Sequence, residues 1–403
     1  MLPEGWHRST LGAIARISSG GTPDRSEPAY WGGAVPWVTT GEIQFNTVTD
    51  SDEKITEAGL KNSSAKLFPP GTLLMAMYGQ GKTRGQVAKL GIEAATNQAC
   101  AAIRFNGQND PDFYFQFLSS QYEAIRKLGN AGTQQNLSGG ILKELPVPVP
   151  PVKEQHRIAR ILSTWDQAIA TATRLLANSQ RHKQALLERT LLIPAKKARW
   201  PFRSIAEVAE RIQRRGMHDE ELPILMISSG IGFVRQDEKY SRYMAGKSVE
   251  NYIVLEAGEF AYNKGNSKRY EFGCVFPLRD QARGLVPHVY VCFRLHETNH
   301  SNFFEHLFSA DYLHDQLGAL VNTGVRNNGL LNIRSADFMA CQVPVPALDE
   351  QRQIASALHA ATLWIGQQEY MVARLREEKA ALMAQLLTGK RRVCLVLDGV
   401  PTS

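Results

Sequence analysis

The sequence predicts an α+β protein with two globular parts, separated by a long antiparallel two-helix coiled coil and related by a pseudo-twofold internal repeat. Three observations lead to this prediction. A proline-rich segment recurs with an offset of 196 residues, and a heptad pattern of apolar residues follows each copy. The rest of the chain holds short apolar runs broken by glycine and proline, without the strand–helix alternation of a parallel sheet.

The repeat is clearest where valine and proline alternate. The run VPVP at 147–150 recurs at 343–346, and the pair Glu-Gln follows at 154–155 and again at 350–351. Repeated proline removes backbone donors and keeps the preceding residue extended, so neither run suits a helix. Because the correspondence continues without a gap, we predict the order globular part A, helix A, globular part B, helix B.

The segment after each VPVP run has the pattern of a long helix. Its apolar residues advance by alternating steps of four and three, which is typical of a coiled coil. Roughly 40 residues form a rod of about 60 Å, and a stripe that long needs a partner helix. The alternative is that each helix packs only on its own globular part. The stripe contains Ile158, Leu162, Trp165, Ile169, Leu176 and Leu186 in helix A, and Ile354, Leu358, Ile365, Val372, Leu375, Leu382 and Leu386 in helix B.

Boundaries follow from this pattern. We expect Pro194 to end helix A and Gly389 to cap helix B. Buried strands are expected at 73–77, 100–104 and 289–293. The predicted segments are globular part A at 1–150, helix A at 151–195, globular part B at 196–345, helix B at 346–392 and a C-terminal tail at 393–403.

The positive charge is concentrated in one segment. The chain has 403 residues and a net charge of +7, which invites a nucleic-acid interpretation. Residues 152–199 hold ten basic and three acidic residues, whereas residues 1–151 hold thirteen of each. Recognition of DNA would therefore rest on local loops and not on a broad positive field. The surplus on helix A either faces DNA or meets acidic partner surfaces, and we expect the isolated chain to bind DNA weakly.

Cysteine usage and hydropathy indicate the compartment. The five cysteines (100, 274, 292, 341 and 394) form no CxxC pair, so neither a zinc ribbon nor a disulfide framework is expected. No apolar run approaches the roughly 18 residues of a membrane helix, and residues 1–10 do not resemble a signal peptide. A cytoplasmic location is expected.

Two loops of part A have the composition of a DNA reader. The run AMYGQGKT at 76–83 resembles a phosphate-binding loop, but no amphipathic helix follows it, which disfavours a nucleotide site. Basic, amide and aromatic side chains in such a loop suit DNA phosphates and base edges instead. A second, amide-rich loop lies at 132–136. The candidate DNA-binding residues are Tyr78, Lys82, Thr83, Arg84, Gln86, Gln134, Gln135 and Asn136.

Part B has two loops in the corresponding places. They lie at 262–270 and 324–328, and their sequences differ from those of part A. This difference suggests one fold that reads two targets, although ordinary solvated hairpins have similar compositions. The candidate DNA-binding residues are Lys264, Ser267, Lys268, Arg269, Tyr270, Arg326, Asn327 and Asn328.

One motif suggests an enzyme. His296, Glu297 and His300 match the HExxH pattern of zinc hydrolases, in which one helix face carries both histidines. Here the run follows a strand, and its Thr and Asn residues favour a turn. We therefore predict no catalytic residue and no metal ligand, and keep a zinc hydrolase as the alternative from the enzyme class.

The chain resembles the specificity (S) subunit of type I restriction–modification enzymes. The resemblance rests on 6–11 with SSGGTP at 18–23, VPWVTTGEI at 35–43, both VPVP…EQ helices and LLTGK at 386–390. It implies that each globular part is a target recognition domain that reads half of a bipartite double-stranded DNA site. The coiled coil then sets the spacer and docks methyltransferase subunits. Part B departs from the pattern, because LPILMISSG at 222–230 replaces the run that begins at Val35.

The resemblance also implies partners. Two modification subunits would methylate adenine with S-adenosylmethionine, and restriction subunits would use ATP and Mg for translocation and cleavage. The chain itself would be non-catalytic and hold no cofactor. A related type II restriction system with fused nuclease–methylase partners is the alternative within the binding class.

Overall fold

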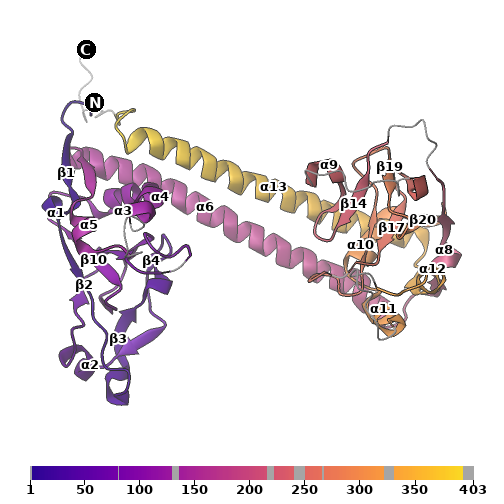
Figure 1. Ribbon diagram of the computed structural model, residues 1–403, viewed down its shortest axis with the longest axis horizontal. Coiled ribbons are helices and arrows are strands. Elements are labelled where there is room, and N and C mark those ends of the chain that lie inside the picture. Colours follow the sequence, from indigo (N-terminus) through magenta and orange to yellow (C-terminus); the bar gives the residue numbers. More distant parts are fainter. Residues whose placement is uncertain are drawn as a thin grey trace, which may run out of the picture. The chain divides into compact units, whose positions relative to one another are not determined.

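The chain folds into two compact units. The computed structural model describes residues 2–79, 81–128, 136–215, 222–239, 250–265, 267–321 and 331–393 (Figure 1). Unit 1 comprises residues 1–173 and 370–403, and unit 2 comprises residues 174–369. Each unit contains one globular part and one portion of each long helix. Since this division cuts both helices, the five segment boundaries expected above stay a prediction.

Unit 1 contains two main sheets and a short strand pair. The pair joins β1 (His7–Thr10) to β11 (Pro146–Val149), the first VPVP run. Most neighbouring strands are antiparallel; β4–β8 and β3–β9 are parallel. The first sheet has the order β2 (Ala15–Ser19), β10 (Cys100–Phe105), β7 (Leu73–Ala76), β8 (Val87–Leu90), β4 (Thr47–Val48), and the second has the order β5 (Glu53–Ile55), β3 (Trp31–Val38), β9 (Ala94–Thr96), β6 (Leu67–Phe68).

The core of unit 1 lies between the first sheet and α3. Strands β7 and β10 are buried apolar runs, as their composition predicted. Phe113 and Phe117 of α3 pack with Ile158 and Leu162 at the start of the first long helix. The short helices are α1 (Leu11–Ile14), η1 (Pro28–Tyr30), η2 (Thr40–Glu42), α2 (Glu57–Lys61), α3 (Pro111–Ser120), α4 (Tyr122–Leu128) and α5 (Gly139–Lys143).

Unit 2 also contains a short strand pair and a main sheet, but its remaining strands form separate two-stranded sheets. Strand β12 (Phe202–Ser204) pairs with β21 (Gln342–Pro344), the second VPVP run. The main sheet has the order β13 (Ala209–Ile212), β20 (Val291–Leu295), β17 (Phe260–Asn263), β18 (Cys274–Pro277). The other elements are the pairs β14 (Leu225–Ser228) with β15 (Gly232–Arg235) and β16 (Ile253–Glu256) with β19 (Arg283–Val286), and helices α8 (Ile205–Val208), α9 (Gln236–Lys239), α10 (Ser301–Ser309), α11 (His314–Leu320) and α12 (Ser335–Met339).

The long helices are α6 (Val152–Leu187) and α13 (Leu348–Leu386). The prediction that Pro194 ends helix A is wrong. A π-helical turn, η3 (Glu188–Leu192), continues α6 and leads into α7 (Ile193–Lys196), where Pro194 occupies the first turn. Since α6, η3 and α7 run on without a break, Pro194 removes one intrahelical donor, and the π-helical turn before it is a local irregularity of the kind that accompanies proline inside a helix. Gly389 has a φ of +72°, which confirms it as the residue that ends α13.

Within each unit the two long helices are antiparallel neighbours. In unit 1, Lys379 Nζ lies 2.6 Å from Asp166 Oδ1, and in unit 2, Trp364 Nε1 donates to Ser179 Oγ at 3.1 Å. All residues of the predicted stripe are buried or partly buried, and most positions between them on α6 and α13 are exposed. The predicted stripe thus lies on the covered side of each helix, while the coiled coil itself stays a prediction.

Two further observations concern hydropathy and the cysteines. In the described ranges no helix combines the length and apolar character that a membrane crossing requires. Cysteines 100, 274, 292 and 341 are free and buried, and burial raises the pKa of the Cys100 thiol to about 12. Cys394 lies outside the described residues.

Candidate nucleic-acid interface

The Glu-Gln pair of each repeat joins a globular part to the start of a long helix. Trp6 Nε1 donates to Glu154 Oε2 at 3.0 Å, and Trp200 Nε1 donates to Glu350 Oε2 at 3.0 Å. An ion pair completes each joint, from Arg392 to Glu154 in unit 1 and from Arg199 to Glu350 in unit 2. Each carboxylate thus holds a tryptophan that enters the globular part and an arginine that follows the other helix.

The glutamine of each pair caps a helix of the globular part. Gln155 Oε1 accepts a hydrogen bond from the Asp110 N–H at 2.8 Å, and Gln351 Oε1 accepts one from the His300 N–H at 2.8 Å. Both amide groups also donate back to the last VPVP proline carbonyl, at 2.8 Å and 2.9 Å. Gln155 and Gln351 are buried. These bonds therefore fix the orientation of α3 and α10 against the start of the long helix that carries each glutamine.

In unit 1 the first candidate loop is a turn between β7 and β8 that α4 supports. The Gly85 N–H donates to the Ala76 carbonyl at 2.8 Å, which closes the turn. From α4, the Tyr122 hydroxyl donates to the Lys82 carbonyl, and the Arg126 guanidinium donates to the Gly81 carbonyl. These bonds are made to backbone carbonyls of the loop. They therefore leave the side chains at its tip available for contact with a ligand.

The predicted residues of this loop separate into exposed and interior groups. Tyr78 is 41% exposed and Lys82 is exposed, whereas Thr83 and Gln86 are partly buried. Arg84 is only 9% exposed, so its side chain lies inside the unit and not toward a ligand. Tyr78 and Lys82 remain the members of the loop that can meet DNA directly.

The second candidate loop of unit 1 lies beside the first. Gln134 and Gln135 lie outside the described residues, and Asn136 is exposed. The next residue, Leu137, donates its N–H to the Met77 carbonyl at 3.0 Å. This bond places the exit of the second loop against the start of the first.

Unit 2 has the same connection between its two loops. The Leu331 N–H donates to the Lys264 carbonyl at 3.1 Å, just where the chain leaves β17. Arg326, Asn327 and Asn328 lie outside the described residues. In both units, therefore, a leucine on the C-terminal side of the second candidate loop bonds to the chain at the start of the first.

The first loop of unit 2 presents a basic tip. Lys268 and Arg269 are exposed, while Ser267 and Tyr270 close the turn beneath them, since the Tyr270 N–H donates to Ser267 Oγ at 3.1 Å. Tyr270 is 2% exposed, and its hydroxyl donates to the Ser309 carbonyl at 3.2 Å. Tyr270 therefore supports the loop and is not available to stack on a base, contrary to its selection from the sequence.

The sequence reasoning missed an aromatic side chain next to the unit 1 loop. Phe45 is 38% exposed, and its ring lies edge-on to Tyr122 with 5.2 Å between the ring centroids. Its φ of +56° is rare for a bulky residue. The surrounding run IQFN has no repeat partner and no motif, so only the three-dimensional structure connects Phe45 with the loop.

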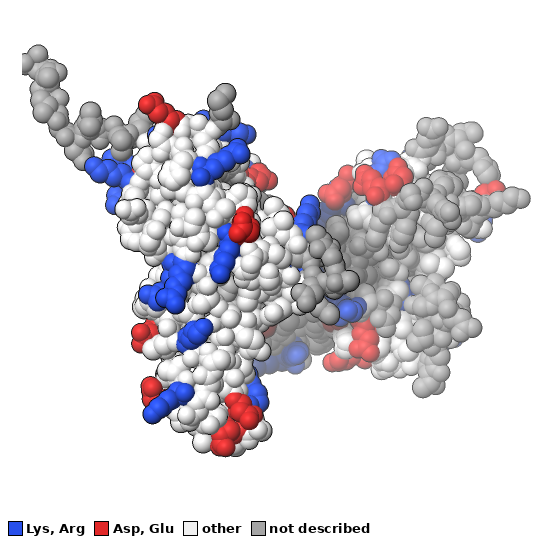
Figure 2. Space-filling model, turned by 60° about the vertical axis from the view of Figure 1, so that its left-hand side comes forward, with Lys and Arg blue, Asp and Glu red and all other residues white. Residues whose placement is uncertain are grey.

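Charge on unit 1 is dispersed. On the face that Figure 2 shows, Lys and Arg side chains lie at separate places with Asp and Glu among them, and they do not merge into one positive field. This distribution agrees with the neutral charge of residues 1–151.

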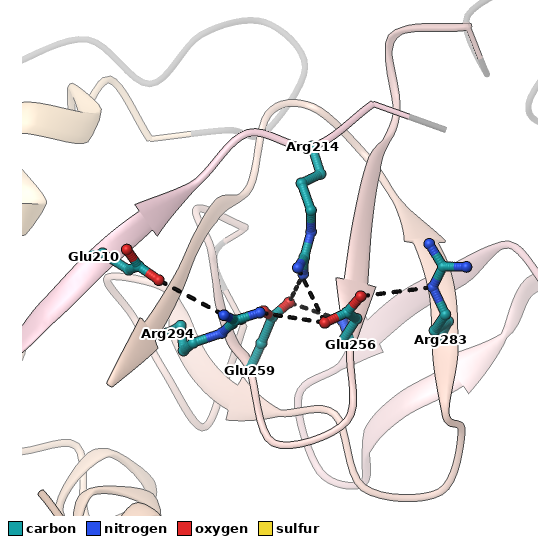
Figure 3. Close-up of polar contacts among 6 residues, drawn as sticks. All are labelled: Glu210, Arg214, Glu256, Glu259, Arg283 and Arg294. Carbon is teal, nitrogen blue, oxygen red and sulfur yellow. Dashed lines mark hydrogen bonds and ion pairs between the residues drawn. The ribbon is translucent and has the colours of Figure 1, made fainter. Parts of the chain in front are cut away.

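A cluster of ion pairs in unit 2 was also missed (Figure 3). Glu259 is 2% exposed, and Arg294 Nε donates to its Oε1 at 2.9 Å, while Arg214 binds the other oxygen. Glu256 lies 3.0 Å from Arg214 and 3.2 Å from Arg294. The bond to Glu259 raises the pKa of Arg294. Because these arginines are engaged with carboxylates, they contribute to the stability of unit 2 more than to a basic surface.

The HExxH residues lie in a turn. They connect β20 to α10, and His300 directly precedes the first helical residue. A zinc hydrolase needs both histidines on one helix face. In a turn the two histidines do not share such a face. Across the described ranges, no group of three or more His, Cys, Asp or Glu side chains is arranged to hold a metal ion.

Comparisons with known proteins point to one family. Residues 3–178 match the type I restriction modification DNA specificity domain. The type I restriction enzyme MjaIX specificity subunit of Methanocaldococcus jannaschii is 29% identical over 173 residues, 42% of this chain and 39% of that protein. The EcoR124I/EcoR124II specificity subunit of Escherichia coli is 27% identical over 193 residues, 45% of this chain and 47% of that protein. The aligned regions thus span less than half of these relatives.

The whole chain shares its fold with a solved structure. The crystal structure of the type I restriction-modification system S subunit from M. genitalium aligns with a TM-score of 0.57 at 15% identity, covering 95% of this chain and 96% of that one. At this identity the likeness concerns the fold alone.

Proposed function

We propose that the chain is the DNA specificity subunit of a restriction–modification complex, since residues 3–178 match the type I restriction modification DNA specificity domain. Each unit reads one half of a bipartite double-stranded DNA site. The long helices set the length of the unread gap between the halves.

The observation that carries this proposal is the recurrence of the paired loops. In both units a leucine that precedes the VPVP run donates its N–H to the start of the loop after the central strand, from Leu137 to Met77 and from Leu331 to Lys264. Equivalent framing with different side chains is what two readers of different half-sites require. Tyr78, Lys82 and Asn136 serve unit 1, and Lys268 and Arg269 serve unit 2.

The partners and cofactors belong to the same proposal. The family resemblance favours two modification subunits that methylate adenine with S-adenosylmethionine, and restriction subunits that consume ATP with Mg. The basic outer face of α6 then meets either DNA or acidic surfaces of these subunits. The chain supplies recognition, and the partners supply the chemistry.

Mapping of methyl-adenine tests the proposal. The chain is expressed with the modification subunit encoded beside it in a host free of methylation, and the host genome is sequenced for methylated adenine. We expect one bipartite motif with an unread gap. A host with no methylated bipartite motif contradicts the proposal.

Variants assign the halves to the units. Lys268→Ala with Arg269→Ala should relax the motif in one half only, and Tyr78→Ala with Lys82→Ala should relax the other. Lys66→Ala, an exposed lysine of unit 1 on the way to β6, is the matched control and should leave the motif unchanged. Equal loss in both halves from either double variant would make these residues phosphate contacts without sequence preference.

A further inference from the structure

Phe45 occupies a backbone conformation that its side chain does not favour. Its φ of +56° is usual for glycine or asparagine and rare for an aromatic residue. The turn is held in place on both sides, since the Phe45 N–H donates to the Val87 carbonyl at 2.9 Å and the Lys89 N–H donates to the Asn46 carbonyl at 2.9 Å. The backbone bonds to β8 therefore fix this conformation, and they would accept a glycine with less strain.

The strained residue is also poorly buried. The ring is 38% exposed and contacts Tyr122 edge-on, so its position is defined without being enclosed. An aromatic residue that serves the core would be expected among the buried clusters of unit 1, as Phe113 and Phe117 are. Strain combined with exposure is more typical of a site that contacts a ligand.

The ring lies close to the candidate loop, with charges of both signs around it, since Glu42, Asp50 and Asp52 line a hollow that includes its neighbours Gln44 and Asn46. The ring of Tyr122 packs edge-on against Phe45, and its hydroxyl donates a hydrogen bond to the Lys82 carbonyl of the candidate loop. The last turn of α4 carries Arg126 and Lys127, and Tyr78 of the same loop is 41% exposed. An exposed aromatic ring beside a loop that carries Tyr78 and Lys82 suits stacking on a nucleic-acid base.

We propose that Phe45 is a stacking wedge, a side chain that enters between base pairs of the half-site read by unit 1 and unstacks one step. This inference rests on the proposed function, because the DNA is the specific site of that complex. Phenylalanine is one of the residues used as wedges in proteins that kink DNA, and the distortion adds a dependence on the flexibility of the step. Phe45 thus contributes specificity without a hydrogen bond to a base.

Fluorescence of 2-aminopurine tests the wedge directly. The probe is a duplex that carries the bipartite motif found by methyl-adenine mapping, with 2-aminopurine placed in turn at each adenine of the motif and its neighbours. The full chain is used in complex with its modification subunit. We expect wild-type protein to raise the fluorescence at one step of the unit 1 half-site, and Phe45→Ala to abolish that rise and weaken binding about tenfold.

Leu67→Ala is the matched control. Leu67 has nearly the same exposure, 39% against 38%, and lies in the same unit on β6 of the other sheet. It should leave both the fluorescence and the affinity unchanged. Phe45→Trp, which keeps an aromatic face, should retain a rise at the same step.

A glycine variant separates a wedge from a structural side chain. Phe45→Gly relieves the positive φ, so we expect its melting temperature to equal or exceed that of Phe45→Ala while DNA binding is lost to the same extent. Melting temperatures of both variants well below that of the wild type would overturn the proposal, since the ring would then serve the fold.

The remaining outcomes are distinguishable. Specific binding by the wild-type complex without any fluorescence rise that depends on Phe45 overturns the wedge and leaves the proposed function standing. Failure of the wild-type complex to prefer the motif over unrelated DNA overturns the proposed function and the wedge together.

Discussion

Units 1 and 2 use the same contacts to join the long helices, but different chemistry directly beside them. The Trp–Glu bonds and the glutamine caps agree in partners and within about a tenth of an ångström in length. Next to them, Gln116 of α3 donates to Asp166 of α6 at 2.6 Å, and Asp166 also holds Lys379 of α13. The two units differ at the position of Asp166.

In unit 2 the corresponding positions lack the carboxylate. His306 lies on α10 at the place of Gln116, and the repeat offset puts Thr362 at the place of Asp166 and Lys183 at that of Lys379. Thr362 donates to its own helix, to the Leu358 carbonyl at 2.8 Å. Contacts that define the joint are therefore repeated, while contacts that only add stability have diverged.

The largest contrast concerns a buried carboxylate. Glu259 of unit 2 stands where unit 1 has Thr72, whose hydroxyl donates to the Pro69 carbonyl at 2.7 Å. Arg294→Met removes a main partner of Glu259 and leaves a carboxylate that is 2% exposed under-compensated. We expect a loss of about 3–5 kcal/mol in the free energy of unfolding of unit 2. Urea denaturation followed by hydrogen exchange of peptides from each unit measures it.

Two comparisons check this prediction. Glu210→Ala removes an outer and half-exposed member of the same cluster and should cost about 0–1 kcal/mol. Thr72→Ala in unit 1 should cost about 1 kcal/mol. Equal losses for Arg294→Met and Glu210→Ala would show that the burial of Glu259 does not matter.

The glutamine caps should be equivalent. Gln155→Ala leaves the Asp110 N–H and the Pro150 carbonyl without their partner, and Gln351→Ala does the same to His300 and Pro346. We expect a loss of about 2–4 kcal/mol from each variant, confined to its own unit. Hydrogen exchange at α3 and α10 distinguishes the two. Losses that differ strongly would break the equivalence of the joints.

A fall in pH should lower the free energy of unfolding of unit 2 more than that of unit 1, because unit 2 has His306 at the place of Gln116. Burial lowers the pKa of His306 to about 4 from its ordinary 6.5. Because the folded state disfavours the protonated imidazole, this stability is complete above pH 6.5 and is lost as the pH falls toward 4. Between pH 7 and pH 5 we expect a loss of about 1–2 kcal/mol, which His306→Gln should remove.

The control for this effect lies within unit 2. Burial also lowers the pKa of His300, so the glutamine variant keeps a residual slope. The measured quantity is the difference between wild type and His306→Gln in urea titrations at each pH. A pH profile that the variant does not flatten contradicts the assignment.

The smallest effect concerns the two helix ends. Ala198, after α7, has a φ of +50°, and Gly389, after α13, has a φ of +72°. Ala198→Gly should raise the free energy of unfolding by about 0.5–1 kcal/mol. Gly389→Ala should lower it, because the added Cβ would lie 2.5 Å from Pro3 Cγ as well as being strained. Thermal melting of both variants is sufficient.

The sequence predicted features that depend on spacing. The heptad stripe could be read because each position contributes the same apolar burial, and the VPVP…EQ repeat marked both joints. The roles of Glu154 and Gln155 within the joint could not be read, since their partners Trp6 and Asp110 are far away in the chain. Pro194 was misjudged because a π turn that precedes it has no sequence pattern.

Side-chain exposure within loops was the weakest prediction. Tyr78 and Tyr270 have the same residue type and similar surroundings in sequence, yet one is exposed and the other is buried beneath its own turn. Composition identifies a loop that suits DNA, but the hydrogen bond from Tyr270 to Ser309 decides which residues reach the surface.

The division of unit 1 into two stretches of sequence has a consequence for synthesis on the ribosome. Unit 2 is one continuous stretch, whereas unit 1 needs residues 370 onward, including Leu386 in its core and Arg392 at its joint. At usual elongation rates of about 5–20 residues per second, the first 173 residues wait on the order of 10–45 s for that segment. During this time the apolar side chains of Ile158 and Leu162 lack part of their cover, and the nascent chain is exposed to aggregation and to chaperones. The first unit to begin synthesis is thus the last to be completed.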